Sequence, residues 1–113
     1  MEDVILDRRN RYRFELAHET NCVIPIQSNV TKPIVGRVDD LSQTGLRMRS
    51  SVRPGMGEQL SAILQCAASG LSEVVQIEVV YVASTALSQF EIGAKFRPPI
   101  PLSTVDRFVT RPQ

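Results

Sequence analysis

The chain has 113 residues, of which 42% are hydrophobic and 5% aromatic, and its formal net charge at pH 7 is +1. This length allows one domain with a small core, and the composition argues against intrinsic disorder. Because no apolar run approaches the roughly 18 residues of a membrane span and the acidic start differs from a secretory signal, we expect a cytoplasmic domain without membrane insertion. Cys22 and Cys66 are too few for a disulfide framework or a zinc site, and we expect buried thiols.

The first twelve residues show no apolar periodicity and are predicted to form a flexible, arginine-rich arm. Arginine accounts for 11 of the 13 basic residues, and four of these arginines fall within six positions: Arg8, Arg9, Arg11 and Arg13. Arginine is favoured where a planar fork must bind a phosphate, a carboxylate or a base edge. Such a cluster is therefore either a solvated basic segment or an anion-binding one.

From residue 13 the pattern becomes that of short strands, in a single domain over 13–113. Six segments are predicted to form strands: 14–26, 34–41, 46–49, 60–66, 74–82 and 90–96. Apolar residues alternate with polar ones in 14–26, 46–49, 60–66 and 90–96, as in half-buried strands, and 74–82 is a run rich in β-branched residues. Pro25 indicates an edge or a break late in the first of these. In the run 74–82, the face that contains Val75, Ile77, Val79 and Tyr81 is expected to be buried, and 83–88 is expected to form a hairpin loop.

The prolines at 98–101 end the β region, and a short helix is predicted to follow. Ser103 is expected to cap it, with Asp106 as a capping-box partner. Val105, Phe108 and Val109 give this helix one apolar face. Six strands followed by one terminal helix predict an all-β fold, a small six-stranded antiparallel barrel with the helix packed over an open end. Closure would remove the sheet edges that so short a chain could hardly protect otherwise.

Two short motifs stand out. The first, Arg9-x-x-x-Arg13, carries little information alone, since roughly one RxxxR is expected by chance in so arginine-rich a chain. The second, Asp40-x-Ser42-x-x-Gly45, has a chance expectation of roughly 0.02 and lies at a predicted strand–turn–strand junction. Asp and Ser before a glycine are also ordinary turn formers, so a purely structural interpretation remains open.

In this order the two motifs resemble those of the PilZ domain family. That family has RxxxR before its first strand and [D/N]xSxxG between its second and third strands. The segments 45–48 (Gly-Leu-Arg-Met) and 93–96 (Gly-Ala-Lys-Phe) also look like the third and last strands of the family. The resemblance extends from about residue 8 to 110. It implies a six-stranded barrel that binds cyclic di-GMP, a bacterial second messenger, without a further cofactor.

The resemblance also implies the ligand-binding residues, and their chemistry suits cyclic di-GMP. Arg9 and Arg13 would hold the phosphates and guanines, because a guanidinium binds both phosphate and the O6/N7 edge of guanine. Asp40 would accept hydrogen bonds from the N–H groups of a guanine. Ser42 would contribute its hydroxyl, and Gly45 is expected to take a positive φ that lets the backbone approach the ligand.

Arg8 bears on the number of ligands. In PilZ domains an arginine at this place is associated with two mutually intercalated cyclic di-GMP molecules, so the resemblance implies a pair. No Ser/His/Asp or Cys/His arrangement supports catalysis, and His18 is expected to be structural. Arg49 and Arg53 are expected to form a solvated face rather than contact the ligand.

We therefore expect a non-enzymatic receptor that changes its surface on binding and regulates an unidentified partner protein in trans, in a pathway such as motility or exopolysaccharide production. One alternative is a PilZ-like adaptor that acts through protein contacts without nucleotide, which typically lacks these motifs. Another is a binder of single-stranded nucleic acid. That function needs exposed aromatic side chains, and the few aromatics and small net charge argue against it.

Overall fold

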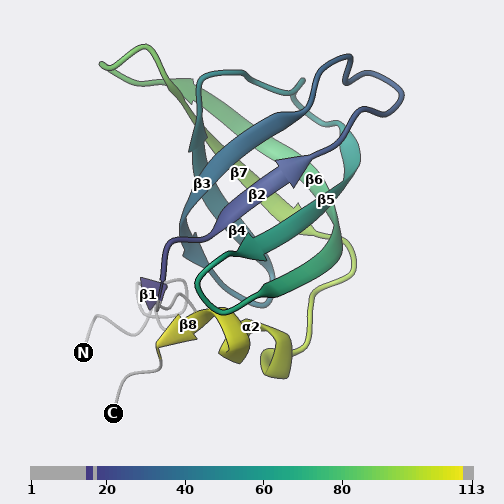
Figure 1. Cartoon of the computed structure of the whole chain (residues 1–113). Coiled ribbons are helices and arrows are strands. Elements are labelled where there is room, and N and C mark those ends of the chain that lie inside the picture. Colours follow the sequence, from purple (N-terminus) through teal and green to yellow (C-terminus); the bar gives the residue numbers. More distant parts are fainter. Residues whose placement is uncertain (1–14, 17, 111–113) are drawn as a thin grey trace, which may run out of the picture.

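A computed structural model of the chain describes residues 15, 16 and 18–110 (Figure 1). Six antiparallel strands form a closed barrel in the order β2-β3-β4-β7-β6-β5. Their bounds are Asn21–Ile24 (β2), Ile34–Leu41 (β3), Gly45–Ser50 (β4), Gln59–Cys66 (β5), Leu71–Ser84 (β6) and Phe90–Phe96 (β7). Two short strands, β1 (Glu15–Leu16) and β8 (Val109–Thr110), pair separately, and one helix, α2, spans Leu102–Phe108. The predicted fold class is confirmed.

The barrel core follows from the alternation of the sequence. In β5, for example, Leu60, Ala62, Leu64 and Cys66 are all buried, whereas the residues between them are partly buried or exposed. Burial of such branched side chains contributes about 1.5–3 kcal/mol each. These inward faces therefore supply most of the free energy that holds the barrel closed.

Helix α2 lies across one end of the barrel (Figure 1) and buries Val105 and Phe108 there, as predicted. The predicted capping box is wrong. The helix begins at Leu102 with Pro101 as its N-cap and no side-chain cap, so Ser103 lies within the first turn. Arg107 in the last turn pairs with Glu73 of β6, which ties the helix to the barrel wall. Among the described residues, no helix is long and apolar enough to cross a membrane.

The first predicted strand, over 14–26, is divided in the structure. Strand β1 ends at Leu16, and β2 begins only at Asn21. Between them the Thr20 hydroxyl donates to the His18 carbonyl at 3.1 Å, a local hydrogen bond that competes with strand pairing. Strand β2 ends before Pro25, which has no N–H to continue the ladder.

Two β-bulges shift the register of strand pairing, one between β3 and β4 and one between β6 and β7. In β3, Val38 pairs with Met48 but Asp40 pairs with Arg47, so Asp39 is an extra residue. In β6 the register shifts in the same way between Val79 and Tyr81. A bulge reverses the inward and outward alternation beyond it.

The bulge in β6 makes the prediction of a buried Tyr81 wrong. Val75, Ile77 and Val79 face the core as expected, but Tyr81 is 38% exposed. The partly buried Val82 packs against the core instead.

A side chain completes the junction between β2 and β5. These strands pair backbone to backbone only from Asn21 to Val23. Beyond them, the Gln27 amide donates to the Ser61 carbonyl at 2.9 Å, and its oxygen accepts from the Ser61 N–H at 2.9 Å. The glutamine side chain thus makes the two hydrogen bonds that a further strand residue would have made.

Both cysteines are buried thiols, as predicted, and they form no disulfide. Burial raises the pKa of Cys22 to about 12. The thiolate is the reactive form, so this cysteine is chemically inert in the folded barrel.

Candidate functional site

Paired charges cluster on the outer face of the barrel where β3 and β4 meet. Asp40 lies 2.7 Å from the Arg47 guanidinium. Asp39, displaced outward by the bulge, binds Arg49 through both carboxylate oxygens, with its closest contact at 2.9 Å. The bulge therefore presents two neighbouring carboxylates, each matched by an arginine of β4.

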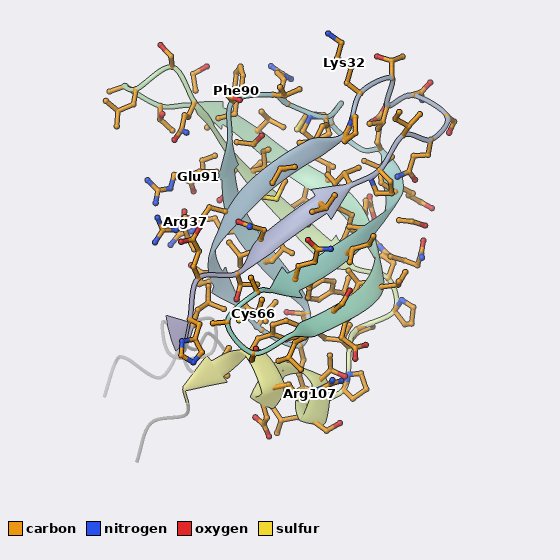
Figure 2. The ribbon with its side chains drawn as sticks, viewed as in Figure 1. Lys32, Arg37, Cys66, Phe90, Glu91 and Arg107 are labelled. Carbon is orange, nitrogen blue, oxygen red and sulfur yellow. The ribbon has the colours of Figure 1, made fainter. Side chains whose placement is uncertain are left out.

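Arg47 links this pair to the next strands. Its guanidinium also lies 3.6 Å from Glu91 of β7, and the Tyr81 hydroxyl donates to Glu91 at 2.7 Å. Burial by itself would lower the pKa of Arg47, but the carboxylates of Asp40 and Glu91 outweigh this effect and raise it. Arg47 is thus a permanent cation between two carboxylates, beside an exposed aromatic ring. Figure 2 shows Glu91 on the same side of the barrel as Arg37 of β3.

Gly93 makes room for that ring. A Cβ at Gly93 would lie 2.2 Å from the Tyr81 ring, so only glycine lets the ring lie across the β7 backbone. Burial and the hydrogen bond to Glu91 raise the pKa of Tyr81 to about 12. The phenol therefore remains a neutral hydrogen-bond donor at physiological pH.

We expect Tyr81 to titrate near pH 12 in a Tyr12→Phe variant, in which it is the only tyrosine. An unperturbed tyrosine titrates near pH 10. Because the folded pKa is the higher one, the phenol contributes stability that is complete below about pH 10 and is lost as the pH rises toward 12. Phenolate absorbance measures the titration, and Glu91→Gln should move it toward 10. A midpoint near 10 with Glu91 intact would contradict the arrangement.

The turn between β3 and β4 is held by Ser42. Its hydroxyl oxygen accepts from the N–H groups of Thr44 at 3.2 Å and Gly45 at 3.3 Å. The Ser42 N–H also donates to the Gly45 carbonyl at 2.9 Å. This buried hydroxyl is therefore directed at the backbone of its own turn.

Gly45 is required for a different reason from the one expected. The expectation of a positive φ is wrong, since only Gly57 and Gly70 among the described glycines have one. A Cβ at Gly45 would instead lie 2.3 Å from the carbonyl oxygen of Ala94 in β7. The glycine allows the turn to approach β7, where the Phe96 N–H donates to the Thr44 carbonyl at 2.8 Å.

Gly45→Ala should therefore lower the free energy of unfolding by about 1–3 kcal/mol, the usual cost of an over-packed contact. Gly36→Ala is the matched control. A Cβ there would meet the Met48 sulfur at 2.7 Å, and a flexible side chain can move where backbone cannot. Denaturant unfolding measures both variants. Equal losses of stability in the two variants would show that the close approach of β7 is not the reason for glycine at position 45.

One depression lies at the turn between β3 and β4, and another lies at the bulge of β3. The first, of about 500 Å³, is lined by Thr44, Lys95, Phe96, Arg97, Pro98 and Pro99. The other, of about 380 Å³, is lined by Leu16, His18, Glu19, Arg37, Val38, Asp39 and Arg49. Neither Lys95 nor Arg37 forms an ion pair with another described residue. Each depression thus offers a cation to an anionic ligand.

The structure brings Asp40, Ser42 and Gly45 together at the end of β3 and the start of β4. The predicted Arg8, Arg9 and Arg13, and the predicted arm over 1–12, lie outside the described residues.

Sequence reasoning missed Arg47 and Tyr81 as members of this surface. Arg47 had a signal, because it lies two positions after Gly45 on the outward parity of the strand. Tyr81 had none, because the bulge that turns it outward depends on pairing with β7.

A small closed barrel with a helix over one end and a charged outer face beside a DxSxxG turn defines the class of domain. The sequence profile of the PilZ domain matches residues 7–111. The chain belongs to the PilZ domain family. PilZ domains are generally non-catalytic receptors for cyclic di-GMP.

Solved structures of MrkH from K. pneumonia share the fold. The MrkH–c-di-GMP complex has a TM-score of 0.61 at 20% sequence identity, over 74% of this chain and 42% of the MrkH chain. MrkH in its apo state has a TM-score of 0.60 at 19% identity, over 76% and 41%. This chain therefore spans about two-fifths of the length of MrkH. A comparison with curated proteins gives no match.

Proposed function

We propose that this protein is a cyclic di-GMP receptor whose ligand lies on the outer face of β3 and β4, next to β7. The observation that carries the proposal is the Asp40–Arg47 pair at 2.7 Å, which lies at the family motif. Cation-bearing depressions lie at the motif turn, beside Thr44, and at the neighbouring bulge, beside Asp39. Cyclic di-GMP offers two phosphates and two guanines. A surface of adjacent carboxylate, guanidinium and aromatic groups matches each of these parts.

Asp40 and Arg47 would exchange partners when the ligand binds. The N–H groups of a guanine are donors, so they compete with Arg47 for the Asp40 carboxylate. Arg47 then directs its guanidinium to a phosphate or to guanine O6/N7, as a charge-assisted bond. The partly exposed Tyr81 ring would stack on a base.

Ser42 and Gly45 would act by positioning. The Ser42 hydroxyl and the close approach of Gly45 to β7 fix the turn that follows Asp40. Ser42 and Gly45 would therefore contribute to binding by fixing the geometry of the turn. Asp40 and the backbone of the turn would make the direct contacts with the ligand.

Arg8, Arg9 and Arg13 would supply the remaining positive charge. Arg13 precedes β1 by two residues, β1 lies close to β3, and Leu16 of β1 lines the depression that contains Arg37. Chain connectivity therefore makes this face accessible to the RxxxR motif. Binding would change the surface that the receptor presents to a partner protein in trans, in the cytoplasm.

Calorimetric titration of the full chain tests the proposal, with cyclic di-GMP, GTP and a short single-stranded RNA as the three ligands. We expect saturable binding of cyclic di-GMP alone, because only this ligand carries two guanines and two phosphates in one ring. No binding of any of the three would overturn the proposal in favour of the nucleotide-independent adaptor. Binding of RNA in preference to cyclic di-GMP would favour the nucleic-acid alternative.

A further inference from the structure

A row of β-branched side chains crosses the outer surface on the other side of the barrel. Val35 of β3 lies opposite Val23 of β2, and Val23 lies opposite Ile63 of β5. Ile63 in turn lies opposite Val74 of β6. Cross-strand neighbours of this kind are about 5 Å apart, so these four residues form one continuous strip, the apolar row. Its two ends are well exposed, with Val35 at 57% and Val74 at 67%.

The apolar row shares no residue with the proposed ligand site. In the barrel order, β2 and β5 lie across from β7 and β4, respectively. Figure 1 shows β2 and β5 on the near side of the barrel, with β4 and β7 behind them. A contact made through the row therefore leaves Asp40 and Arg47 open, and it approaches the ligand site only at Arg37, two positions after Val35.

The surroundings of the apolar row are almost without charge. The positions two residues before and after each member, which face the same way, carry Pro, Asn, Ser or Gln, with Arg37 as the single exception. This contrasts with the Asp40 face, where ion pairs dominate. An apolar centre depleted of charge is the composition of the core of a protein–protein interface.

We propose that the apolar row is the contact surface of a homodimer. A two-fold contact places the same surface of both copies together, so any charge at its centre meets its own copy. The apolar row carries no charge there and can pair with itself without repulsion. A partner with a charged surface would find no complementary charges at the centre of this face.

The size of the surface sets the strength of the dimer. Three outward positions on each of four strands cover roughly 400 Å² per copy at standard strand spacing. A stable interface buries about 800 Å² per partner. The dimer is therefore weak and reversible, and it forms as the protein concentration rises.

Sedimentation velocity of the full chain, from about 10 μM to about 1 mM, spans the dissociation constants of a weak dimer. We expect a monomer at the lower end and an increasing dimer fraction toward the upper end. Val74→Glu and Val35→Lys should each abolish the dimer. Both positions are exposed, so the variants should keep the wild-type melting temperature.

Val52→Lys and Leu87→Glu are the matched controls. These residues are 49% and 77% exposed and lie outside the apolar row, so they should leave the dimer unchanged. Asp40→Ala should dimerise like the wild type, which separates this proposal from that of the ligand site. A chain that stays monomeric at every concentration, or a dimer that survives both row variants, would overturn the proposal. A chain that stays monomeric would indicate that the apolar row contacts a different protein.

Discussion

Asp40→Ala should weaken the binding of cyclic di-GMP by roughly 10- to 150-fold, the loss expected for a charge-assisted hydrogen bond in a ligand site. Asp40 is the carboxylate that the guanine N–H groups would use, and no other acidic side chain of the bulge faces Arg47. Arg13→Ala should cause a loss of the same size, because it removes a guanidinium that would hold a phosphate and a guanine edge. Isothermal titration calorimetry measures both affinities.

The neighbouring residues supply controls for this result. Asp39→Ala removes an equivalent carboxylate, paired with Arg49 at the same bulge, and should change the affinity little. Arg11→Ala removes one positive charge from the same segment without touching the RxxxR motif. Equal losses for Asp39→Ala and Asp40→Ala would show that the ligand responds only to the overall charge of this face.

Two molecules of cyclic di-GMP should bind each chain, and Arg8→Leu should reduce this number to one. A second ligand brings two more phosphates and another guanine face next to the first. A further guanidinium can stack on that guanine and neutralise part of the added charge. Without Arg8 the second dianion would lack compensation, whereas Arg9, Arg13 and Asp40 would still hold the first. Native mass spectrometry and calorimetry both count the ligands.

Arg11→Leu is the matched control for the stoichiometry, since it makes the same change of charge and size three positions away. It should still bind two ligands. A wild-type chain that binds one, or an Arg8→Leu chain that binds two, would show that Arg8 does not set the number.

Strand positions were predictable wherever one face of a strand is buried. Strand β3 spans the predicted residues 34–41 and β7 the predicted 90–96, because each strand buries a set of apolar side chains that the sequence shows. The same rule fails at Tyr81, because one extra residue in β6 reverses the alternation. That insertion is set by pairing with β7, which is distant in sequence.

The candidate site was predictable in its motif but not in its physical basis. The spacing of Asp40, Ser42 and Gly45 located the turn correctly. Glycine is needed at position 45 because of the Ala94 carbonyl, almost fifty residues further along the chain. The residues around Gly45 in the sequence do not indicate this contact. The partnership of Asp40 with Arg47 likewise depends on the bulge at Asp39.

The Gln27 side-chain amide holds the segment after β2 to β5. Closing the barrel requires β2 to pair with β5, for example Val23 with Ile63, forty positions further along the chain, whereas β5, β6 and β7 follow one another as hairpins. Long-range closure of this kind comes late in folding. Among the described strands, β2 and β5 share the shortest backbone pairing of the barrel, from Asn21 to Val23, so this junction has the fewest hydrogen bonds to break. The opened form is a curved sheet with two unpaired edges, the kind of surface that templates aggregation. The two hydrogen bonds of Gln27 thus lengthen the junction that keeps these two edges paired.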